Sequence, residues 1–125
     1  MPFDTAGFLP RRTLTERERL DLVALHLMRA RIAAPRTWCQ HADVNPSGAR
    51  CLLGWANYYT HSGQPPRALL QRLEPFIPPF RISLDRDDPD YAMERVVKFN
   101  DRSSTRKAHV VAVLDKAIAS LAGEE

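Results

Sequence analysis

The sequence is poor in the features that mark secreted or membrane-spanning proteins. Only two cysteines, Cys39 and Cys51, occur among 125 residues, so we expect free thiols rather than a disulfide framework. No apolar run approaches the roughly 18 residues that cross a bilayer. The first residues lack a basic segment followed by an apolar one, which predicts that no secretory signal is present. We therefore expect a cytoplasmic protein with both thiols reduced.

An excess of charge of one sign is also lacking. Eighteen basic residues stand against 15 acidic ones, for a formal net charge of +3, whereas a nucleic-acid surface needs such charges clustered on one face. Acidic residues interrupt the arginines, and no helix-turn-helix pattern is visible. Nucleic-acid binding is therefore a weaker alternative, through the arginines of the first predicted helix, the loop after it and the segment before it. These are Arg11, Arg12, Arg17, Arg19, Arg29, Arg31, Arg36 and Arg50.

Two groups of residues have the composition of a metal site but not its spacing. The first consists of Cys39, His41, Cys51 and His61. Structural zinc sites take two ligands from one tight knuckle, which this spacing does not provide. The second group, Asp85 to Asp90, resembles the start of a calcium loop, but Asp90 and Val96 stand where glycine and glutamate are required. We therefore expect no metal and no cofactor.

What the sequence does contain is a series of helical segments, beginning with a long one. Thr15-Glu16-Arg17-Glu18 fits a capping box at its start, and Pro35 is expected to end the helix at about Ala34. Apolar residues cover most of its circumference, a pattern typical of a central helix with neighbours on several sides. Residues 1–12, with two prolines and a glycine, are expected to form an irregular arm.

Four shorter helices are expected after it. They span about 48–61, 65–74 and 89–99, and then run from a turn at 100–104 to about Ala122. Prolines between the third and fourth helices exclude a regular helix there, and the apolar residues among them predict a packed connector. No segment has the alternation of a strand. The prediction is an all-α fold, a single compact domain at residues 13–122 with about five helices around the central N-terminal one.

The segment from Trp38 to Trp55 contains both cysteines and both tryptophans, and it allows two interpretations. In one, a polar cleft surrounds a nucleophilic cysteine. Its residues would be Trp38, Cys39, Gln40, His41, Asn100 and Asp101. In the other, which we favour, the same residues are structural, and Asn100 and Asp101 cap the last helix. Trp38 would then seal the core, and Gly54 would let a neighbouring helix approach closely.

A second candidate surface is aromatic. Trp55, Tyr58 and Tyr59 fall on one face of the second predicted helix, and aromatic side chains of this kind form a binding patch where they are exposed. Arg31 projects onto the apolar stripe of the first helix. We expect it either to extend its head to solvent at the helix end or to pair with a carboxylate such as Asp101.

From about Leu20 to Leu121 the chain resembles a family of uncharacterised small all-helical proteins from bacteria, notably actinobacteria, and from phages. The matching residues are Trp38-x-Gln40, Asp43 to Gly48, Cys51-Leu52-Leu53-Gly54 and Phe99-Asn100-Asp101. Where that family has glycine, alanine and tryptophan, this chain has His41, Trp55 and Phe99. The family has no assigned activity, so the resemblance implies a compact helical domain and no mechanism.

The absence of a catalytic or cofactor signature favours a non-enzymatic cytoplasmic protein with an interaction or regulatory role, of the kind associated with phages or mobile elements. Its partner is expected to be a protein, a second copy of the chain being one candidate, and not a membrane. A small enzyme that uses Cys39 with the polar cleft is the alternative from another class.

Overall fold

Five α-helices and one 3-10 turn form the part of the chain that a computed structural model describes, residues 13–60 and 66–123. The helices are α1 (Glu16–Ala33), α2 (Leu52–Thr60), α3 (Arg67–Leu73), α4 (Tyr91–Asp101) and α5 (Lys107–Ala122), and the 3-10 turn η1 is Glu74–Phe76. No strand occurs within these residues, which confirms the all-α prediction. The predicted arm at 1–12 lies outside the described residues, as does His61.

The capping box predicted at the start of α1 is present. The Thr15 hydroxyl accepts a hydrogen bond from the Glu18 amide at 3.1 Å, and the Glu18 carboxylate accepts one from the Thr15 amide at 2.8 Å. These two bonds satisfy amide groups that no helical carbonyl can reach. The helix ends at Ala33, where Ala34 takes an extended conformation ahead of Pro35.

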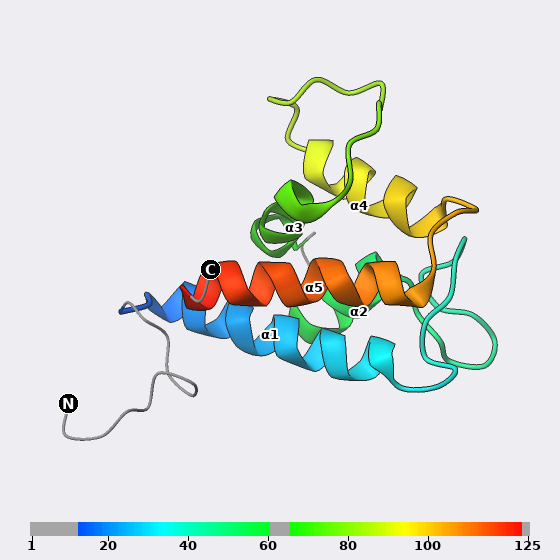
Figure 1. Cartoon of the computed structure of the whole chain (residues 1–125), viewed down its shortest axis with the longest axis horizontal. Coiled ribbons are helices and arrows are strands. Elements are labelled where there is room, and N and C mark those ends of the chain that lie inside the picture. Colours follow the sequence, from blue (N-terminus) through cyan, green and yellow to red (C-terminus); the bar gives the residue numbers. More distant parts are fainter. Residues whose placement is uncertain (1–12, 61–65, 124–125) are drawn as a thin grey trace.

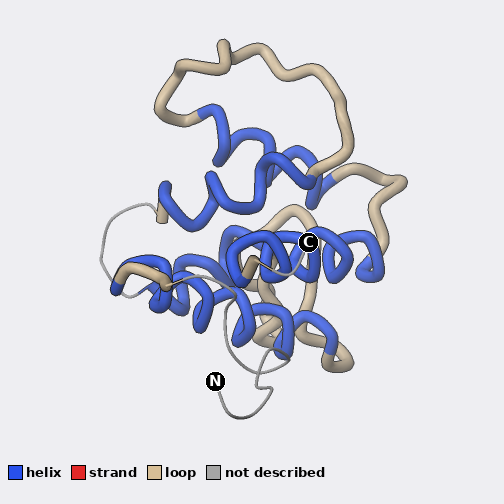
Figure 2. Tube along the Cα trace, turned by 60° about the vertical axis from the view of Figure 1, so that its left-hand side comes forward, coloured by secondary structure: helices blue, strands red, loops and turns tan. Residues whose placement is uncertain are grey.

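The helices pack in two groups. α1 and α5 lie side by side and run in opposite directions, with α2 packed against α1 (Figure 1). α3 and α4 pack against each other on the opposite side of α5 from α1, and a long irregular loop leads from η1 to α4 (Figure 2). The fully buried side chains come from all five helices. They include Leu25, Met28, Ile32, Leu52, Leu70, Leu73, Val96, Val110 and Leu114.

The prediction of a first helix enclosed by its neighbours is wrong for one of its faces. Leu25, Met28 and Ile32 are fully buried, but Leu20 is 58 %, Val23 56 % and Leu27 43 % exposed. The reason is that α1 packs mainly against α5 and α2, so that its remaining side meets solvent. Asp21, a charged residue on α1, is in contrast buried and forms an ion pair with Arg72 of α3 at 2.8 Å.

The boundary between the last two helices also differs from the prediction. Asn100 and Asp101 form the final turn of α4, and α5 begins only at Lys107. They therefore do not cap α5. The N-cap residue of α5 is Arg106, whose amide donates to Nδ1 of His109 at 2.9 Å.

The connector after α3 is packed, as its apolar residues indicated, and a buried arginine holds it. The Arg95 guanidinium donates to the backbone carbonyls of Ile77, Pro78 and Phe80 at 3.1 to 3.4 Å. It also forms an ion pair with Glu74 at 3.3 Å and stacks on the Phe80 ring. The prolines in this segment have no amide donor to offer, and Arg95 supplies hydrogen-bond partners for three of its carbonyl groups.

Candidate functional site

The loop between α1 and α2 brings the predicted site residues together. It closes on itself through isolated backbone pairings: the Cys39 amide donates to the Arg50 carbonyl at 3.1 Å, and the Arg50 amide donates to the Thr37 carbonyl at 3.0 Å. Three of its residues have positive φ, namely Arg36 at 62°, His41 at 67° and Gly48 at 89°. Such values are rare for residues other than glycine. Hydrogen bonds from residues outside the loop must therefore stabilise this backbone conformation.

Asn100 is the residue that holds it. Its side chain is fully buried, and Oδ1 accepts from the Trp38 indole at 2.7 Å and from the Leu52 amide at 3.0 Å. The amide nitrogen donates to the Cys39 carbonyl at 3.1 Å and to the Asp101 carboxylate at 3.0 Å. All four hydrogen bonds that an asparagine side chain can make are therefore formed. Asn100 does cap a helix, but that helix is α2, whose first amide it satisfies from the end of α4.

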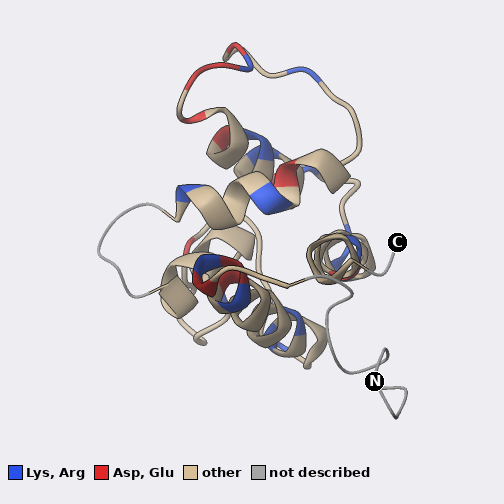
Figure 3. Ribbon diagram, turned by 90° about the vertical axis from the view of Figure 1, so that its left-hand side faces the viewer, with Lys and Arg blue, Asp and Glu red and all other residues tan. Residues whose placement is uncertain are grey.

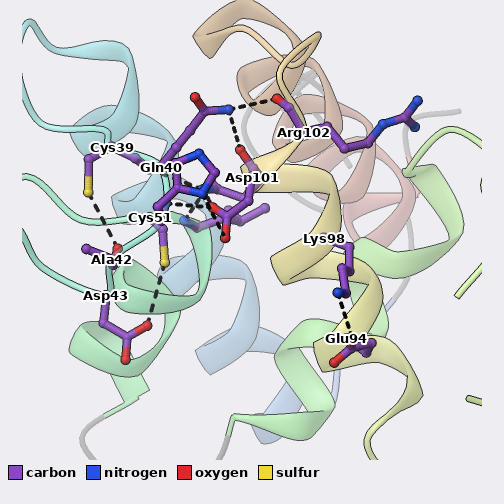
Figure 4. Close-up of polar contacts among 12 residues, drawn as sticks. Cys39, Gln40, Ala42, Asp43, Cys51, Glu94, Lys98, Asp101 and Arg102 are labelled. Atoms are coloured by element: carbon purple, nitrogen blue, oxygen red, sulfur yellow. Dashed lines mark hydrogen bonds and ion pairs between the residues drawn. The ribbon is translucent and has the colours of Figure 1, made fainter. Parts of the chain in front are cut away.

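Gln40 and Asp101 complete this junction between the loop and α4. The Gln40 amide donates to the carbonyls of Asn100 at 2.8 Å and Arg102 at 2.9 Å, which closes the C-terminal end of α4. The Asp101 carboxylate accepts from the His41 amide at 2.8 Å. Figure 4 shows the Gln40 amide extending from the loop toward the backbone carbonyl of Arg102 at the end of α4. The polar residues predicted to form a cleft thus lie together and make hydrogen bonds with one another and with the backbone.

Cys39 lies within this loop and Cys51 is its last residue before α2, and the two thiols make different contacts. Sγ of Cys39 is 3.5 Å from the Ala42 carbonyl oxygen and 3.4 Å from that of Ala49. Burial raises the pKa of the Cys39 thiol, and the negative charge of Asp101 raises it further. A thiol with a raised pKa carries less nucleophilic thiolate at neutral pH than an ordinary cysteine does. The carbonyl oxygens of Ala42 and Ala49 accept hydrogen bonds from the thiol, which only its neutral form can donate.

Cys51 acts as the N-cap of α2. Its Sγ accepts from the Gly54 amide at 3.3 Å, and its carbonyl accepts the first helical hydrogen bond, from the Trp55 amide at 3.0 Å. The Asp43 carboxylate lies 3.9 Å from the same sulfur (Figure 4). Burial is the main cause that raises the pKa of the Cys51 thiol. The neutral thiol therefore has a donor role toward Asp43 and an acceptor role toward the helix.

Gly54 has a different neighbour from the one expected. A Cβ atom at this position would collide with the backbone carbonyl of Asp43 in the loop, not with another helix. The prediction of a close helix–helix approach is therefore wrong, although the reason for a small residue holds. The absence of a side chain at Gly54 lets the loop backbone at Asp43 lie directly on α2.

The aromatic residues of α2 are only in part available to a partner. Trp55 is 4 % exposed, and its indole donates to the Thr37 carbonyl at 2.8 Å. Tyr58 is 40 % exposed and Tyr59 is half-buried. Trp55 therefore belongs to the core, and the surface contribution of the predicted patch comes from the two tyrosines.

Arginines stack on this aromatic group. Arg50 lies over the rings of Trp55 and Tyr58, with its guanidinium carbon 5.5 and 4.9 Å from their centroids. Arg31 lies 5.3 Å from the Trp55 centroid and donates to the Tyr59 hydroxyl at 2.9 Å. Of the two arrangements expected for Arg31, the pair with Asp101 does not form, and the Asp101 carboxylate instead accepts from the His41 amide and the Asn100 side chain. These contacts attach both arginines to α2 by attraction between cation and ring.

Two other arginines of the predicted nucleic-acid surface have separate acidic partners, and Arg11 and Arg12 lie outside the described residues. Arg17 lies 3.7 Å from Asp21, and Arg29 pairs with Asp115 of α5 at 2.9 Å. Acidic and basic residues lie next to each other at the N-terminal end of α1 and along the loop before α4 (Figure 3). In residues 13–60 and 66–123 no histidine, cysteine and carboxylate side chains are grouped as three potential metal ligands. None of the helices in these ranges has the length and apolarity needed to cross a membrane.

Sequence reasoning missed one surface, an apolar ridge on α1 that consists of Leu20, Val23 and Leu27. Together with Tyr59 and Thr60 of α2, the ridge borders a shallow groove of about 180 Å³. The signal was present, because these residues repeat at spacings of three and four on a helix with apolar residues elsewhere too. The sequence does not show which of the two apolar sides of α1 the other helices cover.

The fold and this site define a small all-helical domain whose inter-helix loop is fastened by a buried asparagine. A family model described as "Family of unknown function (DUF6197)" matches residues 18–120, and the chain belongs to this family. No curated protein and no solved structure matches the chain.

Proposed function

We propose that the protein is a non-enzymatic interaction protein that binds another protein through the apolar ridge Leu20, Val23 and Leu27. The observation that carries the proposal is the exposure of these three side chains on one face of one helix. Scattered exposed apolar residues are ordinary, but a contiguous set with a groove beside it is a feature of binding surfaces.

The chemistry of the polar junction supports binding over catalysis. A catalytic group needs a free atom aimed at a substrate, whereas Asn100 uses every donor and acceptor of its side chain and Gln40 donates to two carbonyls. The raised pKa of the Cys39 thiol opposes the activation that a nucleophile requires. The junction is better suited to holding α1, α2 and α4 in a fixed arrangement.

We further propose that this interaction has a regulatory role in the cytoplasm, in a phage or mobile element; the phage setting follows the resemblance, which itself implies no activity. A protein partner also fits better than nucleic acid. Arg17 and Arg29 face carboxylates, and Arg31 and Arg50 lie against aromatic rings, so these charges form no single basic surface.

Site-specific crosslinking tests the proposal. A photoreactive residue at Val23 is expected to yield a crosslinked protein species in cells that carry the natural gene, and a second change of Leu20 and Leu27 to Gln should abolish it. The same photoreactive residue at Lys98, exposed on α4, is the matched control. Equal crosslinking from both positions, or none from Val23, would overturn the proposal.

Thiol labelling against pH provides an independent test of the enzymatic alternative. Cys39 is expected to react more slowly at neutral pH than a small free thiol, because its pKa is raised. Fast labelling of Cys39 below pH 7 would instead favour a catalytic cysteine.

A further inference from the structure

The ridge on α1 carries opposite charges at its two ends. Glu16 lies one helical turn before Leu20, and Arg31 lies one turn after Leu27, and both are exposed. At about 100° per residue, Glu16, Arg31 and the three ridge residues all fall within an arc of about 80°. One face of α1 therefore reads acidic, apolar, apolar, apolar, basic from its first turn to its last.

We propose that this face binds the same face of a second copy of the chain, with the two α1 helices antiparallel; this inference rests on the proposed function and names its partner. The spacing is symmetric about a point between Val23 and Ala24, because Glu16 precedes Leu20 by the same four residues that separate Leu27 from Arg31. A two-fold axis near Val23 places Leu20 opposite Leu27 of the other copy. It also places Glu16 opposite Arg31 of the other copy, and the symmetry repeats this pair at the other end of the contact. A parallel pair would instead bring like charges together at both ends.

Other features of the structure fit this arrangement. The two-fold axis gives each copy the same contact, as isologous dimers require, and antiparallel helices align their dipoles favourably. The only carboxylate beneath the groove, among the residues that line it, belongs to Asp21. It is already bound to Arg72 at 2.8 Å and lies 3.7 Å from Arg17, so its charge is neutralised beside the apolar contact.

The size of the surface predicts a weak dimer. α1 has 18 residues and is about 27 Å long, whereas stable dimers bury roughly 800 Å² on each partner. Three aliphatic side chains and the edge of α2 provide less than that. We therefore expect a dissociation constant of about 10 to 100 µM, and a moderate dependence on salt, because exposed ion pairs are screened.

Sedimentation velocity of the full chain from about 1 to about 500 µM tests for self-association over this range. The wild type is expected to shift from monomer to dimer, and the Leu20→Gln/Leu27→Gln variant to dissociate at least about tenfold more readily, since the leucines supply most of the apolar contact. Circular dichroism should show that the variant remains folded, because both side chains are exposed in the single chain. A wild type that stays monomeric throughout would overturn the proposal.

Single cysteines test the register. Under mild oxidation, Val23→Cys is expected to form a disulfide-linked dimer, because the two-fold axis brings this position next to its own copy. Leu20→Cys and Leu27→Cys should each fail to link alone and should link when mixed. The wild type, with Cys39 and Cys51, is the control. A parallel pair would instead link each variant to itself and would overturn the antiparallel arrangement.

A third test exchanges the charges at the two ends of the ridge. Glu16→Arg and Arg31→Glu should each weaken association about threefold, since exposed pairs contribute little, and the double variant should recover it. Arg31 also contacts Trp55 and Tyr59, so recovery is the informative result; additive losses would count against the pairing.

These tests can also show that something other than a second copy binds the ridge. If Phe8→Ser creates self-association that the wild type lacks, then the N-terminal residues cover the ridge and the second copy is not its partner. If the pure protein is monomeric while Val23 crosslinks another protein in cells, the second copy is excluded and the interaction function stands. A wild type that stays monomeric and gives no crosslink from Val23 would reject the two proposals together.

Discussion

Two regions of this protein reverse the usual relation between polarity and burial. At the junction of the loop with α4, polar side chains are buried, and Asn100 has no exposed surface at all. On α1, three large aliphatic side chains are about half exposed. The junction is stable because each buried polar atom of Asn100 has a partner. The ridge has no such compensation within the described residues, and for that reason the two regions have different roles.

The contrast follows from the number of helices. A helix with apolar residues over most of its circumference needs neighbours on three sides, and α1 packs mainly against two, α5 and α2. The polar junction has the opposite origin, since an inter-helix loop must find partners for its backbone groups wherever it is covered. Stability should therefore depend strongly on the junction and on the inner side of α1, and weakly on the ridge.

The largest expected difference lies between two leucines of one helix. Leu25→Ala removes a fully buried side chain and should reduce the free energy of unfolding by about 2 to 5 kcal/mol, because it leaves a cavity. Leu27→Ala, at a 43 % exposed position, should cost about 1 kcal/mol or less. Urea unfolding at low protein concentration measures both. Equal losses would show that the ridge is covered within the single chain.

The second test concerns the junction. Asn100→Ala leaves the Trp38 indole and the Leu52 amide without their buried acceptor, and it should cost about 2 to 4 kcal/mol. Asn57→Ala, at an exposed position in α2, is the matched control and should stay within about 0.5 kcal/mol. Thermal unfolding of the two variants compares them. A small effect at Asn100 would mean that water replaces its hydrogen bonds and that the junction is open.

Much of the fold could be predicted from local patterns. The capping box at Thr15, the stop at Pro35 and the stripe of α5 around Val110 and Leu114 each depend on a few neighbouring residues, and the structure has them. Local rules failed where partners come from far along the chain. Asn100 lies in an Asn-Asp turn signal just before a helix, which favours a cap of that helix, yet its acceptor reaches Leu52, 48 residues away.

The sequence predicts which residues make up the candidate site, but not how they are arranged. Trp38, Gln40 and Asn100 do lie together, but only the structure shows that their hydrogen bonds run to one another and to backbone groups. The ridge was obscured for a related reason. Periodicity shows that a side of α1 is apolar, and it carries no information on how many neighbours the fold provides.

Cys51 gives a third, smaller effect with a pH dependence. Cys51→Ala removes the N-cap of α2 and should cost about 1 kcal/mol, whereas Cys51→Ser keeps a capping atom and should cost less. Because burial raises the pKa of the Cys51 thiol above its usual 9.0, the folded state holds this proton more tightly than the unfolded one. The associated stability is present below pH 9 and is lost as the pH rises through the folded pKa.

Unfolding of wild type and Cys51→Ser between about pH 7 and pH 11 isolates this contribution, since the other titrating groups are common to both. The wild type should lose stability above pH 9 faster than the serine variant. Parallel curves would mean that Cys51 is exposed to solvent, and the sealed junction would then be less closed than its contacts indicate.

The smallest expected effect tests whether the junction stores strain in its backbone. His41 has φ of 67°, a conformation that costs a residue with a side chain about 1 to 2 kcal/mol, while glycine loses about 0.5 to 1 kcal/mol in conformational entropy. His41→Gly should therefore stabilise the protein by about 0.5 kcal/mol, or about 2 to 4 °C in Tm. His26→Gly, at an exposed helical position of α1, should destabilise it by a similar amount.

The His41 amide keeps its bond to Asp101 in the His41→Gly variant, so a loss of stability at this position would have one source. It would mean that the imidazole, 3.9 Å from the Asp101 carboxylate, contributes more than the left-handed backbone costs, and that the junction depends on side chains that solvent still reaches.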